Sequence, residues 1–210
     1  MKVLIVAGVP DVPIEEKFDK YIGVDYGSLW LIENQLPLDL AVGDFDSVSN
    51  DEFEKISENA LEMIRLHAEK DETDFEVALS EAVTKFPDAE YMIIGALGGR
   101  LDHQLANIYL PTTEKFSAFA PRMTLINQQN TVKYLFEGQH KLQRVPERKY
   151  IGFVQIDATS KLTIENAKYP LRAEKNFATI YASNEFIDET MSVNCSKGML
   201  IAIYSADIIA

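Results

Sequence analysis

Short apolar runs alternate with helix-like segments over the first ~125 residues. The runs predict buried strands over 2–7, 21–25, 38–42, 61–66, 91–94 and 123–127. Between them the sequence predicts helices over 27–35, 50–59, 73–86 and 101–110. One helix face is clearest within 73–86, where apolar residues recur at three- and four-residue spacings: Phe75, Ala78, Leu79, Ala82 and Phe86. This alternation predicts a mostly parallel, Rossmann-like α/β sheet.

The pattern changes after about Asn127. Short apolar runs separated by polar, Gly or Pro residues predict strands over 132–136, 150–156, 161–164, 177–182 and 199–204, with no long helical period. The polar stretch Gln128-Gln129-Asn130 marks the junction. We therefore expect an α/β domain over 1–128 and an all-β domain, a β-sandwich, over 129–210.

Composition narrows the possible partners. The 210 residues carry a formal net charge of −13, which disfavours nucleic acid and anionic membranes but permits a nucleotide held through a metal ion. The apolar opening at 3–9 is interpreted as a buried strand and not as a signal peptide, and no apolar stretch approaches the ~20 residues of a membrane span. Cys195 is the single cysteine, so an intrachain disulfide is impossible and a cytoplasmic location is expected.

The first acidic cluster is Gly43-Asp44-Phe45-Asp46-Ser47, directly after a predicted strand. Ligands of an open α/β sheet bind at the carboxyl ends of its strands. Asp44 and Asp46 project to the same side of extended backbone, so both carboxylates can reach one hard cation. The alternative is a solvated Asp-rich turn.

The second cluster, Lys70-Asp71-Glu72-Thr73-Asp74, opens the helix predicted over 73–86. Asp71 and Asp74 lie on one side of the first turn, where free backbone amides attract phosphate. Lys70 would neutralise a phosphate oxygen. The alternative is ordinary helix capping by Asp or Thr.

The third cluster runs from Gly95 to His103. The Gly98-Gly99 turn brings backbone amides close to an anion, and Arg100 adds a planar donor for phosphate. The alternative is a plain strand-to-helix turn capped by Asp102. His103 is interpreted as structural, and the sequence contains neither the P-loop nor the dinucleotide-binding glycine pattern.

In order, residue types and spacing, the three clusters resemble the motifs of thiamine pyrophosphokinases. An Asp-x-Gly element of that family is similar to Asp25-Tyr26-Gly27. In the predicted β domain, Ser183-Asn184-Glu185 and Tyr169-Pro170-Leu171 resemble family segments, although some relatives carry Trp where Tyr169 stands. The resemblance covers nearly the whole chain, and its specificity comes from the ordered set of motifs.

The resemblance implies residue roles. Mg²⁺ would be held by Asp44, Asp46 and Asp74. ATP would be bound by Asp25, Gly27, Lys70, Gly98, Gly99 and Arg100. Thiamine's hydroxyl would attack the β-phosphorus of ATP and release AMP, with Lys70 and Arg100 stabilising the phosphates. Asp71 or Asp102 would accept the hydroxyl proton, and the sequence does not choose between them.

The family resemblance also implies a homodimer in which thiamine lies between the α/β domain of one subunit and the β domain of the other. Tyr169, Ser183 and Asn184 would then bind thiamine in trans. Two other functions use the same residues: a Mg²⁺-dependent nucleotide hydrolase, with water as the acceptor, and a nucleotide-sensing module without turnover.

Overall fold

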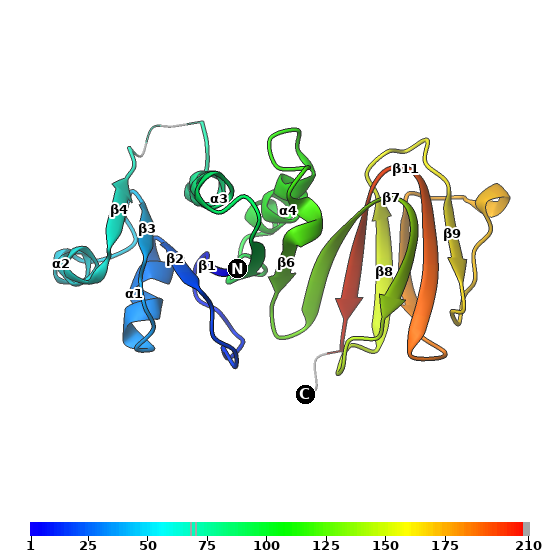
Figure 1. The fold of residues 1–210 in the computed structure, drawn as a ribbon, viewed down its shortest axis with the longest axis horizontal. Helices are drawn as coiled ribbons and strands as arrows, with labels where there is room; N and C mark the ends of the chain where they lie inside the picture. The colour runs from blue at the N-terminus through cyan, green and yellow to red at the C-terminus, as the bar shows by residue number, and fades with distance from the viewer. Residues whose placement is uncertain (68, 70, 208–210) are drawn as a thin grey trace. The chain divides into compact units, whose positions relative to one another are not determined.

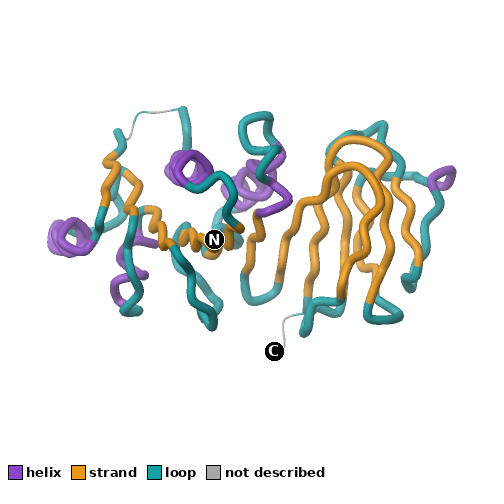
Figure 2. The backbone as a smooth tube through the Cα atoms, viewed as in Figure 1, coloured by secondary structure: helices purple, strands orange, loops and turns teal. Residues whose placement is uncertain are grey.

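A computed structural model of the protein describes residues 1–67, 69 and 71–207 (Figure 1). The chain divides into two compact units, Met1–Gln128 and Gln129–Ala210. Figure 2 shows that helices and strands alternate in the first unit, whereas strands dominate the second. Each unit is described by itself.

The first unit is built on a parallel sheet in the order β6-β5-β1-β2-β3-β4. Its strands are β1 (Lys2–Val6), β2 (Lys20–Val24), β3 (Leu40–Gly43), β4 (Glu62–Arg65), β5 (Glu90–Ile94) and β6 (Met123–Ile126). The chain passes outward from β1 to β4 and returns to β5 on the other side of β1. The strand order therefore reverses beside β1, which is where open α/β sheets place their ligands.

Helices cover both faces of this sheet. They are α1 (Tyr26–Glu33), α2 (Asn50–Asn59), α3 (Asp74–Lys85) and α4 (Leu101–Tyr109). Figure 1 shows α3 and α4 on one face and α1 and α2 on the other. Leu29 of α1 and Ile56 of α2 pack with Leu4 and Val6 of β1 in one buried cluster. The predicted parallel α/β sheet is confirmed, and its elements lie close to their predicted ranges.

The second unit is a β-sandwich. Its strands are β7 (Asn130–Gln143), β8 (Tyr150–Gln155), β9 (Leu162–Glu165), β10 (Ile180–Glu185) and β11 (Thr190–Ser205). The first half of β11 pairs with β9 and the second half with β8, while β7 pairs along both halves. Side chains from both halves, such as Val193 and Ala202, share one buried core.

Two predicted strands of this unit were too short. The sequence predicted 132–136 and 199–204, but β7 and β11 run through Gly138 and Gly198. These glycines, which look like turn signals, have φ of 115° and 75°. They lie at an irregularity where the register shifts between Cys195 and Met199, so they bend continuous strands instead of ending them.

The strand predicted over 177–182 was misplaced, because β10 begins at Ile180 and continues to Glu185. Phe177 is 84% exposed and lies before the strand, where its ring packs edge-on against Tyr181. An apolar run alone therefore placed the strand start too early. Within the described ranges, none of the helices combines the length and apolar character that crossing a membrane requires.

Candidate functional site

A cavity of about 460 Å³ lies where the strand order of the first unit reverses. It is lined by the ends of β1 and β2 and by the first turns of α3 and α4. Its polar lining includes Asp25, Ser47, Thr73, Asp74, Asp102, His103 and Asn107. Segments from all three predicted clusters therefore meet here.

Three carboxylates gather at this position: one oxygen each of Asp25, Asp44 and Asp74 lies within 4.8 Å of the others. Asp25 follows β2, Asp44 follows β3, and Asp74 opens α3. Parallel strands end at the same edge of a sheet, which explains why residues distant in sequence converge. The predicted metal ligands were Asp44, Asp46 and Asp74; the structure groups two of them with Asp25, which the resemblance had assigned to ATP.

Asp46 lies outside this carboxylate cluster. Its side chain is exposed, and its backbone N–H donates to Asp44 Oδ1 over 3.1 Å. The i, i+2 argument expected both side chains to leave an extended backbone on one side. Phe45, between them, has a φ of 60°, so the backbone turns there and the two carboxylates separate.

The backbone holds Asp25 in an unusual conformation. Asp25 precedes α1 with a φ of 47°, and its side chain makes no capping hydrogen bond to the helix. Its Oδ1 instead accepts the Phe45 N–H over 3.3 Å. A Cβ at Gly43 would lie 1.9 Å from the same Oδ1, so only glycine leaves room for this carboxylate. Positive φ in a non-glycine residue is strained, and such strain is common at functional sites.

Crowding changes the proton affinity of the cluster. Burial, followed by the negative charge of Asp74, raises the pKa of Asp25 to about 7. Asp44 and Asp46 raise this pKa further, and the Phe45 N–H lowers it. Three partly buried carboxylates this close repel one another and supply the hard oxygen ligands that Mg²⁺ prefers. The cluster therefore suits a divalent cation.

The second predicted cluster is divided in the structure. Thr73 is the N-cap of α3, and its hydroxyl accepts the Glu76 N–H over 3.1 Å. The capping alternative thus applies to Thr73, while the Asp74 carboxylate belongs to the carboxylate cluster with Asp25 and Asp44. Asp71 is exposed and does not line the cavity. Lys70 lies outside the described residues.

The third predicted cluster forms an open turn before α4. Gly98 and Gly99 have φ of 106° and 70°, and a Cβ at either would meet nothing within 4 Å. Arg100 Nη2 donates to Asp102 Oδ2 over 2.6 Å, and both side chains are largely exposed. The Arg100 hydrogen bond is the main cause that lowers the pKa of Asp102. The N-cap position is Arg100, so the alternative in which Asp102 caps the helix does not hold.

Two polar residues of α4 in the lining were missed by the sequence analysis. His103, interpreted as structural, lines the cavity, as does Asn107 one turn later. Asn107 Nδ2 donates to the Ala96 carbonyl over 2.9 Å and so attaches α4 to the turn after β5. The four-residue spacing of His103 and Asn107 on a helix is the signal that would have found them.

The predicted thiamine residues lie together in the second unit. Tyr169 is 57% exposed. Ser183 is exposed in β10 with a φ of 59°. Asn184 is buried, at 4% exposure, and its side chain hydrogen-bonds the Tyr169 backbone.

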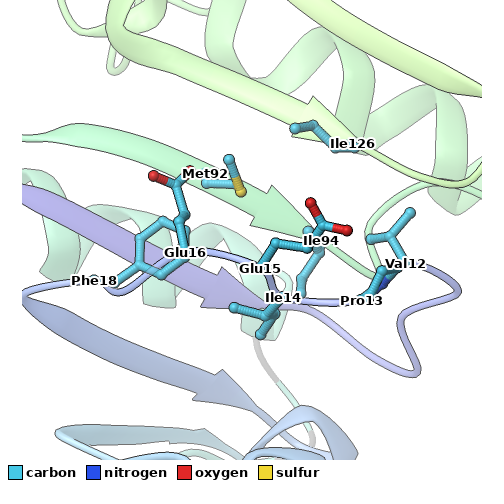
Figure 3. A pocket seen from close by; sticks show the side chains of 9 residues that line it. All are labelled: Val12, Pro13, Ile14, Glu15, Glu16, Phe18, Met92, Ile94 and Ile126. Atoms are coloured by element: carbon cyan, nitrogen blue, oxygen red, sulfur yellow. The ribbon is translucent and has the colours of Figure 1, made fainter. Parts of the chain in front are cut away.

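A second cavity, of about 380 Å³, has a different character (Figure 3). Its walls are mainly apolar, from the loop between β1 and β2 and from strands β5 and β6, with Ile14, Phe18 and Ile126 among them. Glu16 at its edge pairs with Lys2. None of the predicted site residues that the structure describes lies here, and its apolar walls do not suit phosphate.

The open parallel sheet, the reversal of strand order and the carboxylate cluster define an α/β protein of the class that binds its ligand at the carboxyl ends of the strands. Residues 14–120 match the family description "Thiamin pyrophosphokinase, catalytic domain". Residues 139–200 match "Thiamin pyrophosphokinase, vitamin B1 binding domain". The chain belongs to the thiamine pyrophosphokinase family, which confirms the resemblance.

Individual relatives agree with this assignment. The chain is 34% identical to the thiamine pyrophosphokinase of Bacillus subtilis over 97% of this chain and 98% of the relative. The structure of a thiamin pyrophosphokinase family protein from Enterococcus faecalis has a TM-score of 0.91 and 40% identity, covering 98% of this chain and 99% of that one. Yeast thiamin pyrophosphokinase, at 12% identity and a TM-score of 0.73 over 97% and 86% of the chains, shares the fold.

The vitamin B1 domain match fits thiamine as a small-molecule partner of this chain. These findings do not favour either alternative function, the nucleotide hydrolase or the sensing module.

Proposed function

We propose that the protein transfers a pyrophosphoryl group from ATP to the hydroxyl of thiamine in a Mg²⁺-dependent reaction that yields thiamine diphosphate and AMP. The observation that carries this proposal is the cluster of Asp25, Asp44 and Asp74 beside a cavity, in a chain of this family. Transfer of such a group requires charge neutralisation and positioning more than covalent help from the protein.

Asp25, Asp44 and Asp74 would hold the metal ion. When bound, Mg²⁺ would neutralise charge on the phosphate oxygens. Gly98 and Gly99 would present backbone amides to the phosphates, since their open turn leaves room for an anion. Arg100 would move its guanidinium from Asp102 to a phosphate, and Lys70 would act beside it. Asp25-Tyr26-Gly27 would complete the ATP site at the start of α1.

The proton of the thiamine hydroxyl would pass to Asp71 or Asp102. The hydrogen bond from Arg100 lowers the pKa of Asp102 and makes this carboxylate a weaker proton acceptor while the pair persists. If Arg100 turns to phosphate, Asp102 regains basicity. Release of Arg100 therefore links phosphate binding to the activation of Asp102 as a base.

Thiamine would be recognised by the second unit, where the exposed ring of Tyr169 offers a face to its cationic thiazolium ring and Ser183 offers a hydroxyl. We propose a homodimer in which these residues complete the site of the other subunit. A cytoplasmic location is part of the proposal, because ATP is the donor and the free Cys195 thiol suits a reducing compartment.

Product analysis tests this proposal. The protein is incubated with ATP, Mg²⁺ and thiamine, and the expected products are AMP and thiamine diphosphate in equal amounts. ADP with thiamine monophosphate would indicate an ordinary kinase. ATP breakdown without thiamine would indicate a hydrolase, and ATP binding without any turnover would indicate a sensing module.

A further inference from the structure

The loop that carries Tyr169 is attached to β10 through its backbone. The Tyr169 N–H donates to Asn184 Oδ1 over 3.0 Å, and Asn184 Nδ2 donates to the Tyr169 carbonyl over 2.8 Å. The same Oδ1 also accepts the Glu185 N–H over 2.9 Å. One side-chain amide therefore satisfies both backbone groups of Tyr169, as a neighbouring strand would.

A β-bulge directs Asn184 to this position. Tyr181 pairs with Phe153 and Asn184 pairs with Ile151, so β10 uses one residue more than β8 between these two pairs. Ser183 has the left-handed φ of 59° that such an insertion favours. Without the bulge, Ser183 would stand opposite Ile151. With it, the Asn184 side chain shares the inward face of Ile151 and is 4% exposed.

The Tyr169 ring itself has little packing to hold it. Tyr169 as a whole is 57% exposed, and the Lys168 ammonium lies over its ring, 5.5 Å from the centroid. Lys168 Nζ is in turn paired with Glu185 Oε1 at 2.5 Å. The ring thus already offers its face to a cation, and its position depends on how the backbone of residue 169 is fixed.

We propose that Asn184 is a positioning residue, which holds the Tyr169 backbone so that the ring stacks on thiamine, and that Asn184 does not itself touch thiamine. This inference rests on the proposed function. It differs from the role implied by the family resemblance, which assigned Asn184 to thiamine contact. Two observations support a positioning role over a thiamine contact. The Asn184 side chain is buried, and both its Oδ1 and its Nδ2 already hydrogen-bond the protein backbone.

A double-mutant cycle on thiamine KM tests the inference. Tyr169→Ala is expected to raise thiamine KM by roughly 2- to 30-fold, the range of a lost cation–π contact. Asn184→Ala should raise it by a similar factor with ATP KM unchanged, and the double variant should be no worse than Tyr169→Ala alone. If the KM increases of the two single variants multiply in the double variant, Asn184 contacts thiamine independently of Tyr169 and the inference is overturned.

Asn176 provides the matched control. Its Oδ1 accepts the Leu162 N–H over 2.7 Å and its Nδ2 donates to the Leu162 carbonyl over 2.8 Å. Asn176→Ala thus removes the same kind of paired hydrogen bond elsewhere in the β-sandwich. Its thiamine KM should stay near that of the wild type. An equal rise in both variants would mean general loosening of the sandwich and would contradict the inference.

Asn184→Asp covers the case in which Asn184→Ala does not fold. The carboxyl group keeps the acceptor for the Tyr169 N–H but can donate to the Tyr169 carbonyl only when protonated. The thiamine KM of this variant, relative to wild type, should therefore fall as the pH is lowered. A ratio independent of pH would contradict the inference.

Hydrogen exchange separates this inference from the proposed function. Asn184→Ala should speed exchange of the Tyr169 amide, because it removes the acceptor of that N–H, while Asn176→Ala should not. Unchanged exchange would refute the positioning role, whatever the activity. Failure of the wild type to form thiamine diphosphate would refute the proposed function and leave the exchange result to decide the positioning of Tyr169.

Discussion

Asp25 shows how one partly buried carboxylate can favour the binding of a cation. Its φ of 47° and the space left by Gly43 hold it against Asp44 and Asp74. Burial with like charges raises its pKa to about 7, so the metal-free cluster is unfavourable when fully ionised. A bound divalent cation would offset both the cost of burying the Asp25 charge and the repulsion from its neighbours.

We therefore predict that Asp25→Asn, Asp44→Asn and Asp74→Asn each reduce turnover by at least ~100-fold, because each removes a charged ligand from the ion that stabilises the transition state. Calorimetric titration should show that each of these three variants also binds Mg²⁺ more weakly than the wild type. Asp46→Asn is the comparison: the sequence expected an equal loss, whereas its place outside the cluster predicts a smaller one. Near-normal Mg²⁺ affinity in any of the first three would remove that residue from the ligand set.

Asp157 gives a pH-dependent prediction in the second unit. Its carboxylate accepts from Lys197 at 2.8 Å and from the Thr159 hydroxyl at 2.6 Å. The Lys197 hydrogen bond, then Thr159, lowers the pKa of Asp157. A depressed folded-state pKa adds stability above the unfolded value, and this stability is lost as the pH falls through the folded value.

Asp157→Asn should therefore lower the Tm at pH 7, and the difference from wild type should shrink as the pH falls below about 4. Thermal denaturation across that range measures it. Thr159→Val is the matched variant, since it removes the hydroxyl donor but keeps Lys197 and the Thr159 N–H, and it should produce a smaller change. A difference that is constant with pH would show that Asp157 acts by packing and not by charge.

Helix α1 depends on a close backbone approach. A Cβ at Gly27 would lie 2.1 Å from the Val6 carbonyl oxygen, so α1 starts nearly in contact with the end of β1. Gly27 was expected to bind ATP, and this contact provides a packing reason for the same glycine. The packing contact and a role in ATP binding are compatible, because the close approach of α1 to β1 brings the helix start to the candidate site.

Gly27→Ala should destabilise the protein by about 1–3 kcal/mol, the usual cost of overpacking, since the atoms that the new Cβ would meet belong to the backbone and cannot rotate away. Urea denaturation measures the change. If stability is unaffected, α1 can move away from β1. ATP affinity measured on the same variant then shows whether the helix start must stay in place to bind the nucleotide.

Strands β7 and β11 show where prediction of strand ends from local sequence patterns fails. Gly138 and Gly198 interrupt the apolar periodicity, and the sequence therefore predicted short strands on one side of each. In the structure both strands continue, because pairing between them extends from Thr190–Gln143 to Ser205–Asn130 across the irregularity. Long-range hydrogen bonding outweighs the local signal of a glycine.

The proposal that two subunits share each thiamine site gives a prediction for the homodimer. Mixing Tyr169→Ala subunits with Asp44→Asn subunits should form heterodimers with one intact site if thiamine is held in trans. Activity should then rise above that of either parent. The measurement is product formation after mixing under conditions shown to exchange subunits. No gain under those conditions would place both residues in the site of one chain.

The sequence by itself determined the parallel α/β sheet, the β-rich unit and the family, since buried strands and ordered acidic motifs are local patterns. Asp44 and Asp74 were recognisable because each stands just after a strand or at a helix start. Only the tertiary structure decided that Asp25 joins them and that Asp46 does not, because backbone turns at Asp25 and Phe45 set those directions. It also decided that Asn184 faces inward, because a β-bulge changes which side chain is buried, and this depends on pairing with a distant strand.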